Sequence, residues 1–178
     1  MNCYGSKDLA RAFRTVRENT IKIAEEIPED KYGFRPAEGT RTVAETLAHL
    51  ATATGWPQAL HGPRLNAVNF ELFMGEMQKA GATAAKLTTK AAILDALRTE
   101  GDKFAAFLES VPDEALAERV SYPAGMQPPD KSRFEMLMSA KEHEMHHRGQ
   151  LMVVERMLGI TPHLTRAMQE RMAQTQKA

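Results

Sequence analysis

Apolar residues recur at spacings of three and four along four long stretches of this chain, about residues 6–27, 42–60, 88–111 and 130–158. This spacing places apolar side chains on one face of an α-helix, whereas a half-buried strand would need strict alternation. We find no convincing strand pattern and no internal repeat. Four amphipathic helices in a chain of this length predict an all-α fold, a four-helix bundle with antiparallel helices.

Capping residues mark the ends of the predicted helices. Thr42 and Glu45 form a capping-box pattern at the start of the second helix. Asp130 or Ser132 is expected to cap the fourth helix, which should stop at Gly159 because glycine readily adopts the left-handed conformation of a helix end. These signals agree with the apolar periodicity, so we expect the long helices to begin and end near these residues.

The segments between the long helices are less regular. The second helix is expected to kink or end at Gly55, and a long connection over 62–87, with a short helix within 67–78, then leads to the third helix. We predict that this connection crosses an end or a flank of the bundle. The segment 112–129 contains four prolines and should be an irregular surface loop, while 165–174 should form a short C-terminal helix.

Composition narrows the class of protein. The chain has 178 residues, which fits a single domain over 1–178, and its 23 Lys plus Arg balance its 23 Asp plus Glu. Zero net charge gives no general attraction to nucleic acid or to anionic membranes, so we expect neither as a partner. One cysteine, Cys3, excludes an intrachain disulfide, and the N-terminal residues show no apolar signal segment. We therefore expect a cytoplasmic protein.

Three histidines are the candidate chemistry of this chain. His143 and His147 lie four residues apart in the apolar stripe of the fourth helix, so their rings lie one turn apart on one side and can bind one cation. His49, in the middle of the second helix, is the third candidate ligand, since bundles build metal sites from facing helices. Three protein ligands would leave one position open for water or substrate. Imidazole alone does not decide the metal, and Zn²⁺ or Ni²⁺ are the favoured candidates.

The same stretch also matches the pattern H-E-x-x-H, in which zincin proteases use the glutamate as a general base. This alternative is disfavoured because a zincin holds its peptide substrate at a sheet edge, and no strand is predicted. Glu144 is rotated about 100° from His143 around the helix axis, so we expect at most an auxiliary base there. His146 should lie at the rim of the site, outside the metal ligands.

Other residues received a structural interpretation. His61 and His163 lie in expected loops, where solvent exposure is the simplest interpretation. Gly101 and Gly149 lie inside predicted helices, where glycine lowers helix stability relative to alanine, and we expect close helix packing at both. The methionines of the fourth helix are expected to be core residues, namely Met136, Met138, Met145, Met152 and Met157.

The fourth helix, HEMHHRGQLMVVERMLG, together with the second helix, VAETLAHLATATGW, resembles the DinB-like superfamily of four-helix-bundle metalloenzymes. The sharpest element is H-x-x-x-H-R-G-Q followed by an apolar helix that ends in Leu-Gly, and the resemblance covers about residues 6–160. It implies that the family's metal triad falls on His49, His143 and His147. Some members are metal-dependent transferases or isomerases that use low-molecular-weight thiols such as bacillithiol or mycothiol.

Three functional hypotheses follow. The first is a metal-dependent transferase or hydrolase acting on a small molecule, with a low-molecular-weight thiol as one candidate co-substrate. Arg35, Arg41 and Arg64 are candidates to bind the carboxylates of a peptide-like thiol. The second is a metal-binding stress or interaction module without turnover, and the third is a metal-free bundle whose histidines form a polar network. The sequence also leaves open that the protein forms a homodimer.

Overall fold

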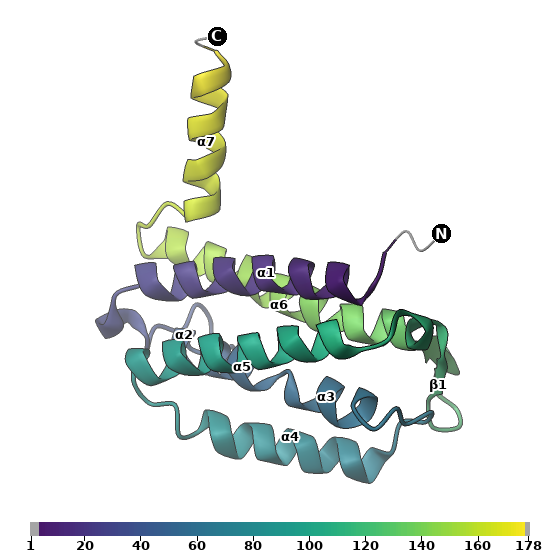
Figure 1. Ribbon diagram of the computed structural model, residues 1–178. Coiled ribbons are helices and arrows are strands. Elements are labelled where there is room, and N and C mark those ends of the chain that lie inside the picture. The colour runs from purple at the N-terminus through teal and green to yellow at the C-terminus, as the bar shows by residue number, and fades with distance from the viewer. Residues whose placement is uncertain (1–3, 177–178) are drawn as a thin grey trace.

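The computed structural model describes residues 4–176 and places four long helical segments side by side (Figure 1). The α-helices are α1 (Ser6–Glu26), α2 (Val43–Thr52), α3 (Gly55–His61), α4 (Phe70–Ala84), α5 (Lys90–Ser110), α6 (Arg133–Met157) and α7 (His163–Thr175). Two short 3₁₀ helices, η1 (Glu29–Lys31) and η2 (Asp113–Ala117), follow α1 and α5. The bundle consists of α1, the α2–α3 segment, α5 and α6, which confirms the predicted fold class.

The connection between α3 and α5 determines the direction of the helices. It carries α4 along the flank of the bundle and returns the chain to the end at which α2 began (Figure 1). As a result α5 runs in the same direction as α2, while α1 and α6 run the opposite way. The predicted crossing over a flank is confirmed, but the bundle is not antiparallel throughout, because α4 supplies the extra passage.

The predicted capping residues begin the helices as expected. The Thr42 hydroxyl accepts a hydrogen bond from the Glu45 backbone N–H at 3.1 Å, and the Glu45 carboxylate accepts one from Thr42 N–H at 2.7 Å. Ser132, not Asp130, caps α6 in the same reciprocal way. Gly159 follows α6 with a φ of +79°, the left-handed conformation that lets glycine end a helix.

The second predicted helix is broken into α2 and α3 at residues 53–54. Pro57 lies in the first turn of α3, where its missing N–H has no helical partner to lose. The break therefore occurs one turn before the proline, as the expected kink near Gly55 indicated.

A buried polar layer separates two hydrophobic clusters in the bundle. One cluster includes Ile23, Leu47 and Leu97, and the other includes Phe13 and Phe104. The side chain of Arg17 lies between the two clusters and packs against Gly101 of α5. A Cβ added at Gly101 would lie 2.9 Å from Arg17 Cγ. Gly101 thus fits the predicted close packing.

Gly149 does not fit the predicted close packing, because a Cβ built there would have no described atom within 4 Å beyond its chain neighbours and the local backbone of α6. It lies on the exposed face of α6. The expected methionine core is also only partly correct, since Met145 and Met157 are exposed while Met136 is buried.

Two segments differ from the sequence-based expectations. The helix in the long connection, α4, spans 15 residues, because Ala80, Ala82 and Ala84 extend it beyond the predicted end. The segment after α5 contains a short antiparallel pair, β1 (Arg119–Ser121) and β2 (Asp130–Ser132), with Val120 opposite Lys131. These strands are too short to show an alternating pattern.

α7 begins and ends close to the predicted limits and projects away from the bundle (Figure 1). In the part of the chain that the structure describes, no helix is both long and apolar enough to span a membrane. Cys3 lies outside the described residues.

Candidate metal centre

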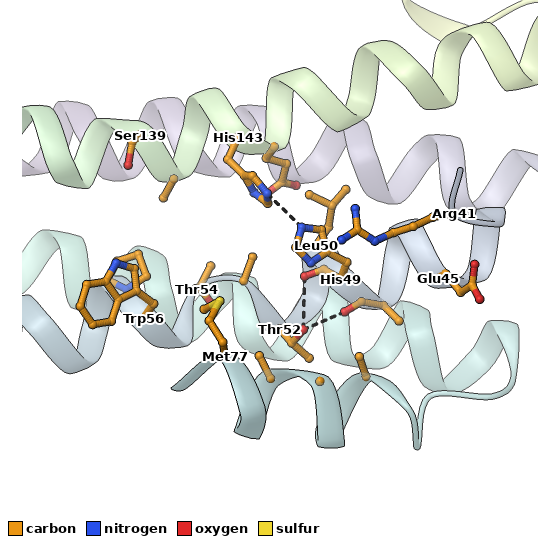
Figure 2. A pocket seen from close by; sticks show the side chains of 18 of the residues that line it. Arg41, Glu45, His49, Leu50, Thr52, Thr54, Trp56, Met77, Ser139 and His143 are labelled. Carbon is orange, nitrogen blue, oxygen red and sulfur yellow. Dashed lines mark hydrogen bonds between the residues drawn. The ribbon is translucent and has the colours of Figure 1, made fainter. Parts of the chain in front are cut away.

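The three predicted histidines, His49 from α2 and His143 and His147 from α6, come together in the structure, and Figure 2 shows His49 facing His143. One ring nitrogen from each of His49, His143 and His147 lies within 4.8 Å of the others. The Nε2 atoms of His49 and His143 are 3.0 Å apart, and the three ring centroids are separated by 4.7 to 5.0 Å. Among the described residues, no other group of histidine, cysteine or carboxylate side chains comes together in this way. These three histidines could hold a metal ion.

The surroundings of the triad keep its imidazoles uncharged. Burial lowers the pKa of His49 to about 4, and the positive charge of Arg41 adds to this effect. Burial also lowers the pKa of His143 to about 4, followed by the effects of its histidine neighbours and Arg41. The pKa of His147 is lowered for the same main reason. Neutral imidazoles with free lone pairs are the form that binds metal ions.

Gln150 fixes the orientation of His147. Its side-chain oxygen lies 2.8 Å from His147 Nδ1, and because an amide oxygen only accepts, Nδ1 carries the proton and donates. This leaves the lone pair on Nε2 of His147. The Gln150 amide nitrogen lies 3.1 Å from Nε2 of His146, which is exposed. His146 therefore lies at the rim, as predicted.

Glu144 is fully engaged by Arg17 in the polar layer beneath the triad. Arg17 Nε donates to one carboxylate oxygen at 2.7 Å and Nη2 donates to the other at 2.9 Å. The same guanidinium donates to the backbone carbonyls of Leu50 and Leu97. Both ionic side chains are at most 5% exposed.

Glu144 is therefore held in an ion pair, because both of its oxygens accept hydrogen bonds from Arg17, which agrees with the expectation of at most an auxiliary base. The arrangement also does not fit a zincin, whose glutamate must face the bound water. Sequence analysis missed Arg17. Arg17 follows the buried Phe13 by four residues and therefore lies on the apolar face of α1. An arginine at such a position was the signal in the sequence for a buried ion pair.

Pockets lie on both sides of the triad. His49 and His143 line one pocket of about 800 Å³, whose wall includes Trp56 and Met77 (Figure 2). His147 lines another pocket of about 860 Å³. Arg41 lines both, and its side chain points toward His49 in Figure 2. Two sides of the triad are therefore open to a small molecule.

The other candidate arginines are engaged elsewhere. Arg35 forms an ion pair with Glu45, and Arg64 forms one with Glu118. Arg41 makes no hydrogen bond or ion pair with any residue in the described range 4–176. Of the three arginines proposed from the sequence, only Arg41 lies beside the triad without a partner in the part of the chain that the structure describes.

The expectations for the other two histidines are wrong. His61 ends α3 with 3% exposure, and its Nδ1 accepts a hydrogen bond from Arg133 at 2.7 Å. His163 begins α7, and its Nε2 lies 3.0 Å from the side-chain oxygen of Asn19. Both were assigned to loops because α3 and α7 extend beyond their predicted limits.

Fold and site together define a class of protein, a helical bundle in which facing helices bring three histidines together beside a pocket. The chain belongs to the DinB family, whose model matches residues 1–178. It is 26% identical over 159 residues to the uncharacterized protein YjoA of Bacillus subtilis, a match that covers 88% of this chain and 92% of YjoA.

Solved structures show the same fold. The crystal structure of the DinB-like protein YjoA from B. subtilis matches with a TM-score of 0.64 and 24% identity, over 86% of this chain and 92% of that one. YfiT from B. subtilis matches with a TM-score of 0.63 and 15% identity, over 88% of this chain and 89% of that one. YfiT is described as a probable metal-dependent hydrolase with an unusual four-helix bundle topology.

A third structure bears on the expected partners. The colibactin self-resistance protein ClbS, solved in complex with double-stranded DNA, matches with a TM-score of 0.55 and 15% identity, over 85% of this chain and 97% of that one. A likeness at this identity shows the fold alone. The absence of a nucleic-acid partner for this chain stays a prediction.

Proposed function

We propose that this protein is a divalent-metal-dependent hydrolase or transferase that acts on a small molecule, with His49, His143 and His147 as the metal ligands. The observation that carries the proposal is the convergence of three neutral imidazoles at the wall of a pocket of about 800 Å³. Pockets of this size accommodate small organic ligands. The description of YfiT as a probable metal-dependent hydrolase supports the same class of reaction.

The donor set fits an ion such as Zn²⁺ or Ni²⁺. Tetrahedral coordination at about 2.1 Å places two nitrogen ligands roughly 3.4 Å apart. The Nε2 atoms of His49 and His143 are already close to that separation, at 3.0 Å. Within residues 4–176 no fourth protein ligand joins the triad. Three ligands and an open position are typical of catalytic sites, whereas structural sites are closed.

The side chains around the triad have separate roles. A bound divalent ion supplies Lewis acidity, which makes water or a thiol a stronger nucleophile near neutral pH. Gln150 holds His147 in the tautomer that binds metal. Arg17 occupies both oxygens of Glu144 with hydrogen bonds, so the proposed reaction does not use Glu144 as its base.

Metal binding is the first test. Chelator-treated protein is titrated calorimetrically with Zn²⁺ and with Ni²⁺, and one equivalent should bind. His143→Ala removes one of three ligands and should weaken binding by about a thousandfold. His146→Ala is the matched control, because it removes a neighbouring imidazole that the proposal leaves outside the ligands. Equal losses in the two variants would disprove the ligand assignment.

Turnover is the second test. Metal-loaded protein is incubated with ester, amide and epoxide substrates, each with and without a low-molecular-weight thiol such as bacillithiol or mycothiol. Product formation without thiol supports the hydrolase, and product that requires thiol supports the transferase. A protein that binds one metal ion and converts none of these compounds would instead favour the non-catalytic metal-binding module.

Three sequence-based expectations accompany the proposal. A single domain over 1–178 should unfold in one cooperative transition. A cytoplasmic location can be checked by cell fractionation. A homodimer, the assembly left open by the sequence, can be tested by sedimentation.

A further inference from the structure

The apolar stripe of α4 faces a pocket. Phe73, Met77, Ala80 and Ala84 recur at helical spacing along α4, and all four line the pocket beside the triad. No residue of α4 is buried. An apolar stripe usually covers a protein core. Here it forms one wall of a hollow that contains His49 and His143 at its polar end.

Aromatic side chains extend this apolar wall. The Trp56 ring, from α3, meets the Phe73 ring edge-on with centroids 5.0 Å apart. Both residues also line a smaller pocket of about 300 Å³, together with Phe70, which is 66% exposed. The apolar surface therefore extends past Trp56 into the second, smaller pocket, farther from the triad.

The charges on the pocket wall leave one cation without a partner. Arg17 is neutralised by Glu144, and Glu45 is paired with Arg35. Arg41 is the remaining charged side chain of this wall and has no partner within residues 4–176. It lies close enough for its charge to lower the pKa of all three triad histidines.

We propose that this pocket binds an organic carboxylate with an alkyl or aryl body. The carboxylate binds Arg41 beside the triad, and the apolar body lies along the stripe of α4 toward Trp56. Guanidinium–carboxylate pairing explains the unpaired arginine, and burial of an apolar body explains the stripe. The inference deepens the proposed function by naming a substrate class, but the binding it describes requires no metal.

Trp56 reports on the pocket directly, because it is the only tryptophan in the chain. Chelator-treated protein is titrated with decanoate, octanoate and decanol while its fluorescence is recorded. Decanoate should shift the emission and bind about fifteenfold more tightly than octanoate, since it has two more methylene groups and each buried methylene contributes about a fourfold factor. Equal affinity for the two acids would contradict burial of the chain along α4.

The head group is tested with Arg41→Gln. This variant should bind decanoate about three- to tenfold more weakly, the range for an exposed to partly shielded ion pair, while its affinity for decanol is unchanged. Arg171→Gln is the matched control, because it removes the same charge from an exposed position on α7. An unchanged decanoate affinity in Arg41→Gln, or the same loss in Arg171→Gln, would overturn the proposal.

The apolar wall is tested on one helix. Met77→Ser should weaken binding of both decanoate and decanol several-fold, about the loss of one to two buried methylene groups. Met74→Ser is the control, because Met74 is exposed on the same helix and does not line the pocket beside the triad. Similar losses in both variants would show that the stripe is not the binding surface.

The outcomes separate this inference from the proposed function. If the protein binds metal and turns over a substrate but Trp56 does not respond to decanoate, the substrate class is wrong and the function stands. If decanoate binds through Arg41 and the triad takes up no metal, the pocket assignment stands and the proposed metal-dependent function fails.

Discussion

The triad and His61 are two histidine sites in which burial lowers the pKa similarly but the ring nitrogens have different partners. Burial lowers the pKa of His49, His143 and His61 to about 4 in each case. At His61 the lone pair of Nδ1 is occupied, because it accepts the Arg133 hydrogen bond at 2.7 Å. In the triad the ring nitrogens face one another. A lowered pKa therefore does not identify a metal site, whereas converging lone pairs do.

Each site also contains a buried arginine, and the two arginines differ in the exposure of their acidic partners. Arg17 pairs with Glu144, which is 2% exposed. Arg133 pairs with Glu118, which is 35% exposed and also bound by Arg64. Removing the first arginine isolates a buried charge, while removing the second leaves a carboxylate that keeps one partner and contact with water.

The largest expected effect is the loss of Arg17. Arg17→Met should lower the free energy of unfolding by about 3–5 kcal/mol, because it leaves an unpaired buried carboxylate. Arg133→Met should lower it by about half as much, since Glu118 remains paired with Arg64. Urea unfolding followed by circular dichroism measures both.

A double variant distinguishes charge from packing in this first comparison. Arg17→Met combined with Glu144→Gln removes both charges and should recover part of the loss. If the loss of stability in the double variant equalled the sum of the losses in Arg17→Met and Glu144→Gln measured separately, the ion pair would make no contribution to the stability of this layer.

The next effect is the pH dependence that comes from His61. An imidazole in the unfolded chain titrates near pH 6.5, whereas burial lowers the pKa of folded His61 to about 4. Between pH 4 and pH 6.5 the unfolded state binds more protons at this residue than the folded state. The contribution of His61 to folding stability is therefore complete above pH 6.5 and is lost as the pH falls toward 4.

From pH 7 to pH 5 this residue should account for about 2 kcal/mol of lost stability. His61→Gln keeps an acceptor for Arg133 and removes the titration. Chelator-treated wild type and variant are compared by urea unfolding at both pH values, so that the triad contributes equally. A variant that loses as much stability as the wild type would show that His61 does not differ in pKa between the two states.

A smaller effect is expected from the residue that orients His147. Gln150→Ala should weaken metal binding by about tenfold or more, because partners of metal-bound histidines typically contribute tenfold to a hundredfold. Gln150→Glu should preserve affinity, since a carboxylate also accepts from Nδ1–H. Calorimetric titration with Zn²⁺ tests the pair, and an equal loss in both variants would argue against the orienting hydrogen bond.

The last comparison concerns the two glycines of the helices that carry or adjoin the triad, of which Gly149 should give the smallest effect. Gly149→Ala should raise the free energy of unfolding by about 0.5–1 kcal/mol, because alanine favours the helix and its Cβ meets no described atom. Gly101→Ala should lower it by about 1–3 kcal/mol, because the new methyl group would press on Arg17. Thermal unfolding of the two variants should shift in opposite directions.

Local patterns in the sequence determined most of the fold, and they also identified the three candidate ligand histidines. Apolar spacing, the Thr42–Glu45 and Ser132–Glu135 capping boxes and Gly159 act within one or two helical turns, so they are visible without any tertiary contact. The i, i+4 spacing of His143 and His147 is local for the same reason. Local patterns failed for β1 and β2, whose strands are three residues long.

The tertiary structure alone decided which side chains are partners. Arg17 binds Glu144 across 127 positions of sequence, and Arg133 binds His61 across 72. Periodicity states which face of a helix is buried, but it does not state which helix packs against that face or at what level. That choice made Glu144 a buried ion-pair partner, buried His61 and left Arg41 beside the triad without a partner among residues 4–176, because each outcome depends on packing between helices distant in the chain.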